Sequence, residues 1–231
     1  MAPRIAVVLC GCGRADGSEI HESVSVLVHL ARLNAAYTCF APDQWQAGVV
    51  NHATGEPAPG EKRNCLVEAA RISRGNIQPL TTLHESAFDA VIFPGGFGAA
   101  KNLCTFAADG AAARVIPDVE RVIKGFHAAG KPIGLCCIAP VLAAKVLGTR
   151  NGGPGCRVTV GQSPEVGAAI ASWGSTSVPV AVDQAVADDD QRIFTSPAYM
   201  DDHATPWQVY TGIGRMVEAT VAACRVPAHA R

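Results

Sequence analysis

Residues 130–145 read GKPIGLCCIAPVLAAK, and this stretch decides both the predicted fold and the predicted site. An apolar strand pattern runs into a sharp turn and then a helix, and two adjacent thiols, Cys136 and Cys137, lie at the junction. Such a strand-to-helix elbow exposes the side chain at its apex and directs backbone N–H groups toward a reacting group. We therefore expect the chemistry at this turn, with either cysteine as the candidate for the apex.

Strand and helix patterns alternate on both sides of the elbow. The apolar run at 4–10 predicts a buried parallel strand, and helical spacing from Val24 to Ala31 predicts a helix that Asp16 or Ser18 caps. A strand at 36–42 completes a βαβ unit, which makes the sheet largely parallel. Further strands are expected at 88–98, 133–135, 157–160, 177–182 and 192–197, and further helices at 115–129, 140–147, 165–172 and 205–224.

The organisation of the chain favours one domain. No repeat or low-complexity linker divides the sequence, although the pattern between residues 43 and 83 does not order the elements there. A chain of 231 residues can bury a substantial core. We predict an α/β fold with a single domain over residues 1–231, in which a doubly wound, mostly parallel sheet is sandwiched by helices.

Composition narrows the classes of partner. A formal net charge of -1 offers no basic surface for nucleic acid, and no apolar run reaches the roughly 18 residues that span a membrane. Nine cysteines, an odd number in a chain of this length, indicate a reducing compartment rather than a disulfide framework. The N-terminal sequence has no secretory signal pattern, so we expect a cytoplasmic protein that binds small molecules or copies of itself.

Ligands of open α/β sheets bind beyond the carboxyl ends of the strands, where three loops are candidates. One follows the first strand and leads to Glu19 and Glu22, the second is PGGFG at 94–98, and the third is the elbow. The N–H of Ile138 and a glycine amide of the second loop, from Gly95 or Gly96, are candidate donors to a developing oxyanion. A buried cysteine is otherwise an inert small hydrophobe, which is the competing interpretation of the elbow.

Four separated motifs carry a family resemblance that covers nearly the whole chain. The segments PGGFGAAKNL at 94–103 and GLCCIAP at 134–140 resemble the DJ/PfpI superfamily, which implies a flavodoxin-like, class I glutamine amidotransferase-like fold. Within it, DGSEIHE at 16–22 and SPAYM at 196–200 resemble the ElbB-type branch, named for isoprenoid biosynthesis and assigned glyoxalase activity. The combination is specific for the family and much less so for the substrate.

The resemblance implies roles for particular residues. The family's elbow cysteine is followed by two small or apolar residues and proline, which matches Cys137 and makes Cys136 the strand-end neighbour. A glutamate of the first helix lies against that sulfur, and the match falls on Glu22, with Glu19 as the second choice and the better candidate for the helix start. Burial and a nearby thiolate would raise the pKa of such a carboxyl group, which suits a proton shuttle.

The sequence does not decide whether a histidine belongs to the site. Protease and amidotransferase relatives often carry a histidine directly after the nucleophile, where this chain has Ile138, and this departure counts against both activities. His203, after the last strand, and His21, beside Glu22, are candidates for reaching the pocket, and a plain surface role competes for both. His29 has the spacing of a helix-surface residue.

The sequence predicts neither a metal nor another cofactor. It has no paired cysteine or histidine set with zinc spacing, and the 95–98 glycines lack the spacing of a nucleotide-binding loop. Lys101 and Asn102 are candidates either for substrate contact or for the start of a helix.

We predict a cofactor-independent glyoxalase, a glyoxalase III-type lyase that converts glyoxal and methylglyoxal to 2-hydroxy acids through a hemithioacetal on Cys137, with Glu22 relaying protons. The alternative is a non-enzymatic redox-sensing or chaperone-like regulatory protein, and an amidohydrolase or protease ranks last. The resemblance also implies a homodimer.

Overall fold

The computed structural model describes residues 2–225, which form a central seven-stranded sheet in the order β3-β2-β1-β4-β5-β9-β8. Every neighbouring pair is parallel except the antiparallel pair of β8 and β9. The strands are β1 Arg4–Val8, β2 Ala36–Ala41, β3 Ile77–Pro79, β4 Ala90–Phe93, β5 Ile133–Cys136, β8 Val186–Asp188 and β9 Ile193–Ser196. The order reverses at β1 and β4, as a doubly wound sheet requires.

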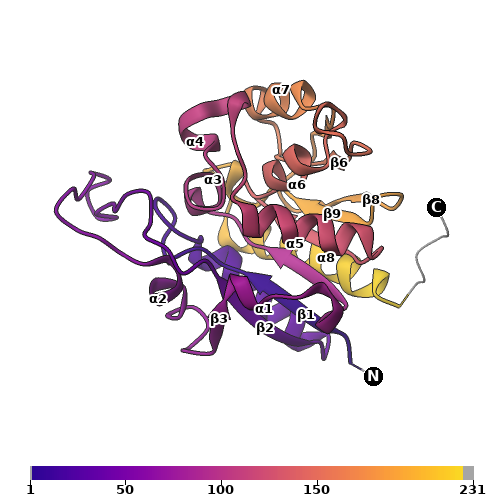
Figure 1. The fold of residues 1–231 in the computed structure, drawn as a ribbon, viewed down its shortest axis with the longest axis horizontal. Coiled ribbons are helices and arrows are strands. Elements are labelled where there is room, and N and C mark those ends of the chain that lie inside the picture. Colours follow the sequence, from indigo (N-terminus) through magenta and orange to yellow (C-terminus); the bar gives the residue numbers. More distant parts are fainter. Residues whose placement is uncertain (1, 226–231) are drawn as a thin grey trace.

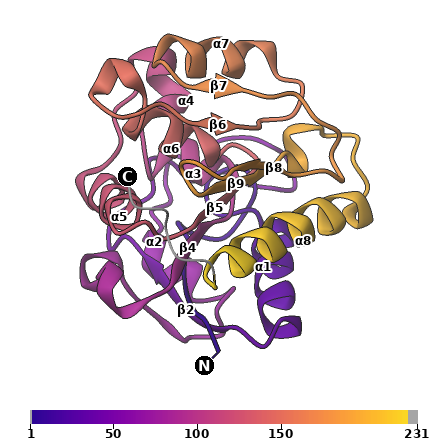
Figure 2. The ribbon, with the colours of Figure 1, turned by 90° about the vertical axis from the view of Figure 1, so that its right-hand side faces the viewer.

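Helices cover both faces of the sheet, as predicted. Figure 2 shows α1 and α8 side by side on one face and α5 on the other. The helices are α1 Ile20–Arg32, α2 Cys65–Ala69, α3 Phe97–Lys101, α4 Phe106–Asp109, α5 Pro117–Ala128, α6 Pro140–Val146, α7 Pro164–Ser172 and α8 Pro206–Ala223. Short 3-10 turns lie at Leu80–Thr82, Glu85–Ala87, Gly110–Ala112, Thr149–Asn151 and Ala198–Met200.

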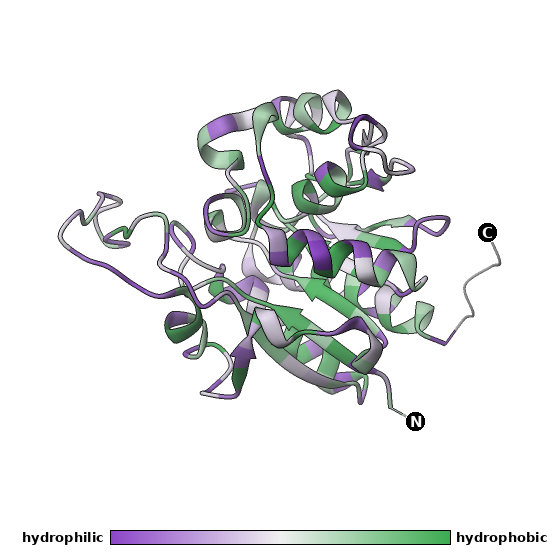
Figure 3. Ribbon diagram, viewed as in Figure 1, coloured by the Kyte–Doolittle hydropathy of each residue, from purple (hydrophilic) through white to green (hydrophobic). Residues whose placement is uncertain are grey.

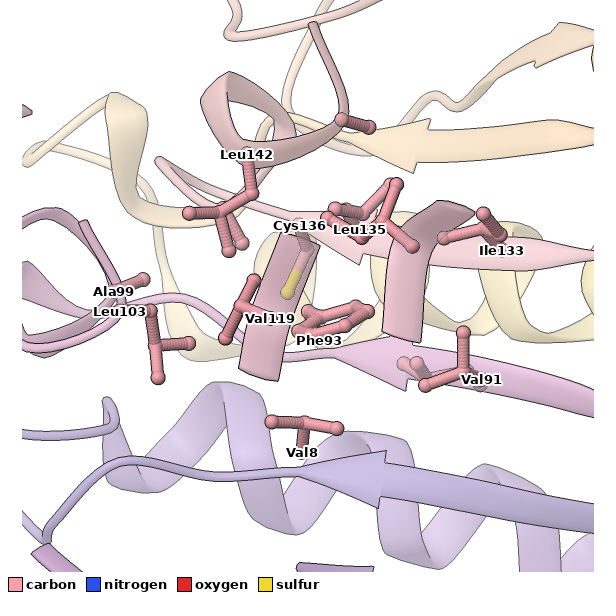
Figure 4. Close-up of a cluster of buried hydrophobic side chains, with 14 of the residues drawn as sticks. Val8, Val91, Phe93, Ala99, Leu103, Val119, Ile133, Leu135, Cys136 and Leu142 are labelled. Carbon is pink, nitrogen blue, oxygen red and sulfur yellow. The ribbon is translucent and has the colours of Figure 1, made fainter. Parts of the chain in front are cut away.

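The core follows the strands that the apolar runs predicted. All residues of β4 and β5 are buried, because helices on both faces exclude water from a parallel sheet. Figure 3 shows these central strands as the most hydrophobic part of the ribbon. Side chains of β1, β4 and β5 meet those of α3, α5 and α6, including Phe93, Ala99, Val119 and Leu142 (Figure 4).

The structure corrects the prediction for residues 177–182. Only Ser177 of this run belongs to a strand, the short β7 (Thr176–Ser177), which pairs with β6 (Arg157–Val158) outside the main sheet. Pro179 lacks the N–H that a ladder needs, and the residues around it are partly or fully exposed. The edge strand β8 comes later, and its three residues are too few for a detectable pattern.

Residues 43–64, which the sequence left unordered, form an extended arm at the carboxyl end of the sheet (Figure 1). The arm is attached at its base by buried polar groups. Asp16 Oδ2 accepts a hydrogen bond from the Val50 N–H at 2.8 Å, and Asn102 Oδ1 accepts one from the Ala47 N–H at 2.9 Å. The short helices α3 and α4 follow β4 and, together with α7, lie above the same end of the sheet (Figure 1).

Candidate active site

Cys137 occupies the apex of the elbow between β5 and α6. Its φ is +58°, in the left-handed region that non-glycine residues rarely adopt, and its N–H donates to the Ser196 carbonyl of β9 at 3.0 Å. Such a conformation costs about 1–3 kcal/mol and persists where the surrounding structure fixes it. Cys136, one residue earlier, is still paired within the sheet and fully buried. The two thiols that the sequence left open therefore have different positions.

Glu22 lies in the first turn of α1 beneath this cysteine. Glu19 is the N-cap of the helix, and its Oε2 accepts a hydrogen bond from the Glu22 N–H at 2.7 Å. This confirms the helix-start role expected for Glu19 and corrects Asp16 and Ser18 as the predicted caps. The fully buried Glu22 carboxyl accepts N–H groups of Gly95 at 3.1 Å and Tyr199 at 3.2 Å, and it also hydrogen-bonds to the Cys137 thiol.

Burial sets the protonation of this pair. Desolvation, reinforced by the charge of Glu19, raises the pKa of Glu22 from 4.5 to about 8, although its hydrogen bonds oppose the shift. Desolvation and the nearby Glu22 also raise the pKa of the Cys137 thiol well above its usual range, against hydrogen bonds from the Gly96 and Ile138 N–H groups. The pair therefore retains its protons near neutral pH.

The start of α6 does not favour a thiolate at Cys137. The helix α6 begins three residues after Cys137 with Pro140, which has no N–H to direct at the sulfur. The two amides that reach the sulfur do not outweigh its burial and the like charge of Glu22. Removing the thiol proton is therefore a task for a base at the site.

The glycines of residues 94–98 allow this loop to pack tightly against Cys137 and Glu22. A Cβ on Gly95 would collide with the Cys137 side chain and lie 2.6 Å from Glu22 Oε2, whereas Gly96 adopts a φ of +94°. The two glycine amides, which the sequence treated as alternatives, have different partners. Gly95 donates to Glu22, so Gly96 and Ile138 are the amides available beside the sulfur.

Cys137 opens onto a cavity of about 560 Å³. Its lining comes from the loop after β1, α3, α4, the elbow, α7 and the segment after β9. The lining residues are Arg14, Glu19, Gly96, Phe97, Ala100, Phe106, Ala107, Ala108, Gly110, Cys137, Ile138, Glu165, Val166, Tyr199, Met200 and Asp202. The site is thus a thiol at the wall of a largely apolar cavity.

Both candidate histidines lie outside this lining. His21 is exposed, and its Nδ1 lies 2.8 Å from the Tyr199 hydroxyl, so it reaches the site only through that residue. His203 is exposed in the turn before α8, where its backbone N–H donates to Asp201. His29 is 5% exposed because it packs against Tyr210 of α8, and its predicted surface position is wrong.

Lys101 and Asn102 also lie outside the cavity lining. The Lys101 ammonium donates to the Ala15 carbonyl at 2.8 Å, and the Asn102 side-chain amide donates to the carbonyls of Cys10 and Asp16. Asn102 also ends α3 as its C-cap. These contacts hold the loop after β1 against α3 and Asn102, so the geometry gives both residues a structural position and does not bring them to the cavity.

Sequence reasoning missed much of the cavity wall. Tyr199 belongs to a quoted motif, but nothing in its pattern indicated that its N–H would hold Glu22. In the structure, Ala198 has a φ of +46° after Pro197, and this strained turn directs the Tyr199 amide toward Glu22. Phe106 lies in α4, a four-residue helix too short for periodicity to reveal.

Three further observations bear on the class of protein. In residues 2–225, no three His, Cys, Asp or Glu side chains gather so as to hold a metal ion. None of the helices described there is long and apolar enough to cross a membrane. All nine cysteines lie within this part of the chain and have free thiols.

Comparison with known proteins supports one family, although no family model matches the chain. The chain is 50% identical over 225 residues to human "glutamine amidotransferase-like class 1 domain-containing protein 3, mitochondrial", covering 94% of this chain and 81% of that protein. Identity to the Danio rerio "ES1 protein, mitochondrial" is 37% over 231 residues, covering 93% of this chain and 83% of that protein.

Solved structures give the same result. An "isoprenoid biosynthesis protein with amidotransferase-like domain" from Ehrlichia chaffeensis is 36% identical, with a TM-score of 0.88 over 96% of this chain and 99% of that one. Drosophila melanogaster DJ-1beta, at 17% identity and a TM-score of 0.54 over 97% of this chain and 95% of that one, shares the fold. The mostly parallel sheet and the cysteine elbow are those of a class I glutamine amidotransferase-like protein. The chain belongs to the family of the glutamine amidotransferase-like class 1 domain-containing and ES1 proteins, and it shares the fold of the DJ/PfpI superfamily.

Proposed function

We propose that the chain is a cofactor-independent glyoxalase that converts small 2-oxoaldehydes to 2-hydroxy acids. The observation that carries the proposal is the buried contact between the Cys137 thiol and the Glu22 carboxyl group at the wall of an open cavity. A thiol beside a base is the arrangement of nucleophilic catalysis, and a carboxyl group with a pKa of about 8 exchanges protons readily near neutral pH.

In the first step, the fraction of Glu22 that is ionised near neutral pH accepts the thiol proton as the Cys137 sulfur bonds to one aldehyde carbon. The carbonyl electron pair moves to oxygen, which then takes the proton from Glu22 and completes a neutral hemithioacetal. While it is charged, this oxygen lies next to the sulfur, where the Gly96 and Ile138 amides are the available donors.

In the second step, Glu22 removes the proton from the carbon that bears sulfur, and an enediolate forms. Glu22 returns this proton to the neighbouring carbon, and the hydroxyl proton passes to the oxygen of that carbon, which gives a thioester of a 2-hydroxy acid. Water hydrolyses this thioester and returns the free thiol. Glyoxal plus water thus gives glycolic acid, and methylglyoxal plus water gives lactic acid, with no external oxidant or reductant.

The test is turnover of glyoxal by the purified protein, with glycolate identified by proton NMR. We expect Glu22→Gln to lose turnover, because an amide cannot accept the thiol proton. Glu56→Gln is the matched control, since it removes an exposed carboxylate outside the cavity. Turnover by Glu22→Gln at the wild-type rate would contradict the mechanism.

A redox-sensing or chaperone-like role is the alternative function. Sensor cysteines are accessible and have a lowered pKa, whereas Cys137 is 7% exposed and burial raises its pKa. Formation of a sulfinic acid at Cys137 under mild peroxide, without glyoxal turnover, would favour this role. Amidohydrolase or protease activity ranks last, because Ile138 follows the nucleophile and neither His21 nor His203 lines the cavity.

The proposed homodimer has a candidate interface on α1. Ile20, Val24 and Val28 recur every four residues along the helix, and each is 43–44% exposed. We expect Val24→Asp to produce a monomer in light scattering after gel filtration. The control is Val67→Asp, at an exposed valine of α2. A wild-type monomer at micromolar concentration, or a Val24→Asp dimer, would contradict this interface.

The nine free thiols support a reducing compartment. The names of the human and Danio rerio relatives place those proteins in mitochondria. The cytoplasmic location predicted for this chain is therefore retained only as a prediction, which microscopy of the fluorescently tagged protein would test.

A further inference from the structure

We propose that the cavity accepts 2-oxoaldehydes that carry an apolar group of aromatic size and no negative charge. This inference rests on the proposed function and narrows its substrate class. Three features of the described residues carry it, namely the size of the cavity, the chemistry of its wall and its charges.

The cavity is much larger than glyoxal, which has only four non-hydrogen atoms. Cavities of about 300–1,000 Å³ hold drug-sized ligands, and this one of about 560 Å³ lies within that range. A two-carbon aldehyde on Cys137 would leave most of the space unfilled. Binding free energy from the remote part of a larger substrate would instead position the aldehyde at the sulfur.

The wall near the thiol is apolar. Phe97 is 48% exposed although it is a large hydrophobic residue, and Phe106 is held edge-on against Trp173 with ring centroids 5.8 Å apart. Val166 and Met200 line the same space. An aromatic or branched alkyl group bound here would remove its own surface and that of Phe97 from water. Burial of this apolar area contributes a favourable free energy of about 25 cal/mol per Å².

The charges of the lining are mainly negative. Glu19, Glu165 and Asp202 contribute three carboxylates, and Arg14 is the guanidinium among the lining residues. Arg14 lies 3.4 Å from Asp202, so that pair compensates itself. Within residues 2–225, no cation forms a salt bridge with Glu19 or Glu165. An anionic ligand would therefore meet two carboxylates that form no salt bridge, of which Glu165 is exposed and Glu19 also accepts an N–H at the start of α1.

These carboxylates also distinguish substrate from product. The aldehyde enters as a neutral molecule, whereas the 2-hydroxy acid is a carboxylate at neutral pH. The carboxylates of the lining oppose retention of that product. We expect weak inhibition by 2-hydroxy acids and poor turnover of aldehydes that bear a carboxylate or phosphate.

The kinetic test compares kcat/KM for phenylglyoxal, glyoxal and 4-carboxyphenylglyoxal in initial-rate measurements. We expect phenylglyoxal to exceed glyoxal by about tenfold or more, since differences of one or a few apolar groups are worth this much in a fitted pocket. The carboxylated compound should be severalfold worse than phenylglyoxal. Equal values for the two aryl aldehydes, or a preference for glyoxal, would overturn the inference.

Glu165→Gln tests the charge directly, because Glu165 lies at the exposed start of α7. We expect the discrimination between the two aryl aldehydes to narrow severalfold. Glu56→Gln is the matched control, since Glu56 is exposed on the 43–64 arm away from the lining. Unchanged discrimination in Glu165→Gln would remove the electrostatic part of the proposal.

A binding measurement separates this inference from the proposed function. Isothermal titration of the wild-type protein uses neutral 2-hydroxyacetophenone and anionic mandelate, neither of which is an aldehyde. Preferential binding of the neutral compound without turnover of any aldehyde would contradict the glyoxalase function and retain the cavity's ligand class. Turnover of glyoxal without preferential binding of the neutral compound would retain the function and overturn the ligand class.

Discussion

Cys136 and Cys137 are adjacent thiols with different surroundings. Cys136 ends β5, pairs with Ser196 and is fully buried, and its sulfur lies 3.9 Å from Glu22 Oε2. Cys137 also contacts Glu22, but its left-handed backbone brings it out of the sheet, toward the cavity and the Gly96 and Ile138 amides. Burial raises the pKa of both thiols, so backbone position, rather than an intrinsically acidic thiol, distinguishes the candidate nucleophile from its neighbour.

The largest expected difference between the two thiols is in turnover. We expect Cys137→Ala to lower glyoxal turnover by about a thousandfold or more, as loss of the nucleophile does in enzymes that act through a covalent intermediate. Cys136→Ala should retain turnover within a few fold, because its sulfur does not line the cavity. Steady-state kinetics of both variants measures the contrast, and equal losses would contradict it.

Glu22, which both thiols contact, should make folding stability depend on pH. Its carboxyl group keeps its proton up to about pH 8 when folded but loses it near pH 4.5 when unfolded. Between these values the folded state binds more protons, so the wild-type free energy of unfolding falls as pH rises, by up to about 1.4 kcal/mol per pH unit. A glutamine in place of Glu22 does not titrate, so the variant lacks this pH dependence of stability.

We therefore expect Glu22→Gln to gain stability relative to wild type between pH 5 and pH 8.5, by a few kcal/mol in total. Urea unfolding at several pH values measures this difference. Parallel stability curves for the two proteins would show that the pKa of Glu22 is not raised.

The packing around Cys137 should tolerate less change than the packing around β5. A Cβ at Gly95 would collide with the Cys137 side chain and the Cys136 carbonyl, whereas at Gly134 it would meet side chains such as Met216. We expect Gly95→Ala to cost more than the about 1–3 kcal/mol typical of overpacking, and Gly134→Ala to stay within that range. Urea unfolding of both variants checks the order, and a reversed order would contradict it.

The smallest expected effect concerns the Tyr199 hydroxyl, which contacts His21 rather than Glu22 or Cys137. Tyr199→Phe removes the hydroxyl that lies 2.8 Å from His21 but keeps the N–H that binds Glu22. We expect a loss of about 0.5–1.5 kcal/mol in stability and only a few fold in turnover. A loss of turnover as large as that of Cys137→Ala would instead place the hydroxyl in the chemistry.

The sequence predicted the parts of the fold that depend on long apolar runs. Strands β1, β4, β5 and β9 and helices α1, α5 and α8 are confirmed because central strands and helix stripes are buried regardless of detail. The strands β3 and β8 were not predicted, since edge strands of three residues carry little apolar signal. The strand predicted at 177–182 was wrong because this run is apolar in composition but is not buried in the sheet.

The sequence predicted the two central residues of the candidate site but not the residues that form the rest of the cavity wall. Cys137 and Glu22 occur in motifs, and the elbow and the first helix turn bring them together. Phe106 and Glu165 reach the cavity only because α4 and α7 fold over the end of the sheet, an arrangement that no local pattern encodes. The raised pKa of Cys137 was also not predicted, because burial depends on the complete fold.

The most direct test of the coupling between Cys137 and Glu22 is the pH dependence of Cys137 alkylation by iodoacetamide, followed by mass spectrometry. The Glu22 charge opposes ionisation of the thiol, so its removal should lower the thiol pKa. We expect alkylation of Cys137 in Glu22→Gln to rise at a lower pH than in wild type, with Cys136 unlabelled in both proteins. A midpoint that is unchanged or higher in Glu22→Gln would contradict the coupling on which the proposed chemistry depends.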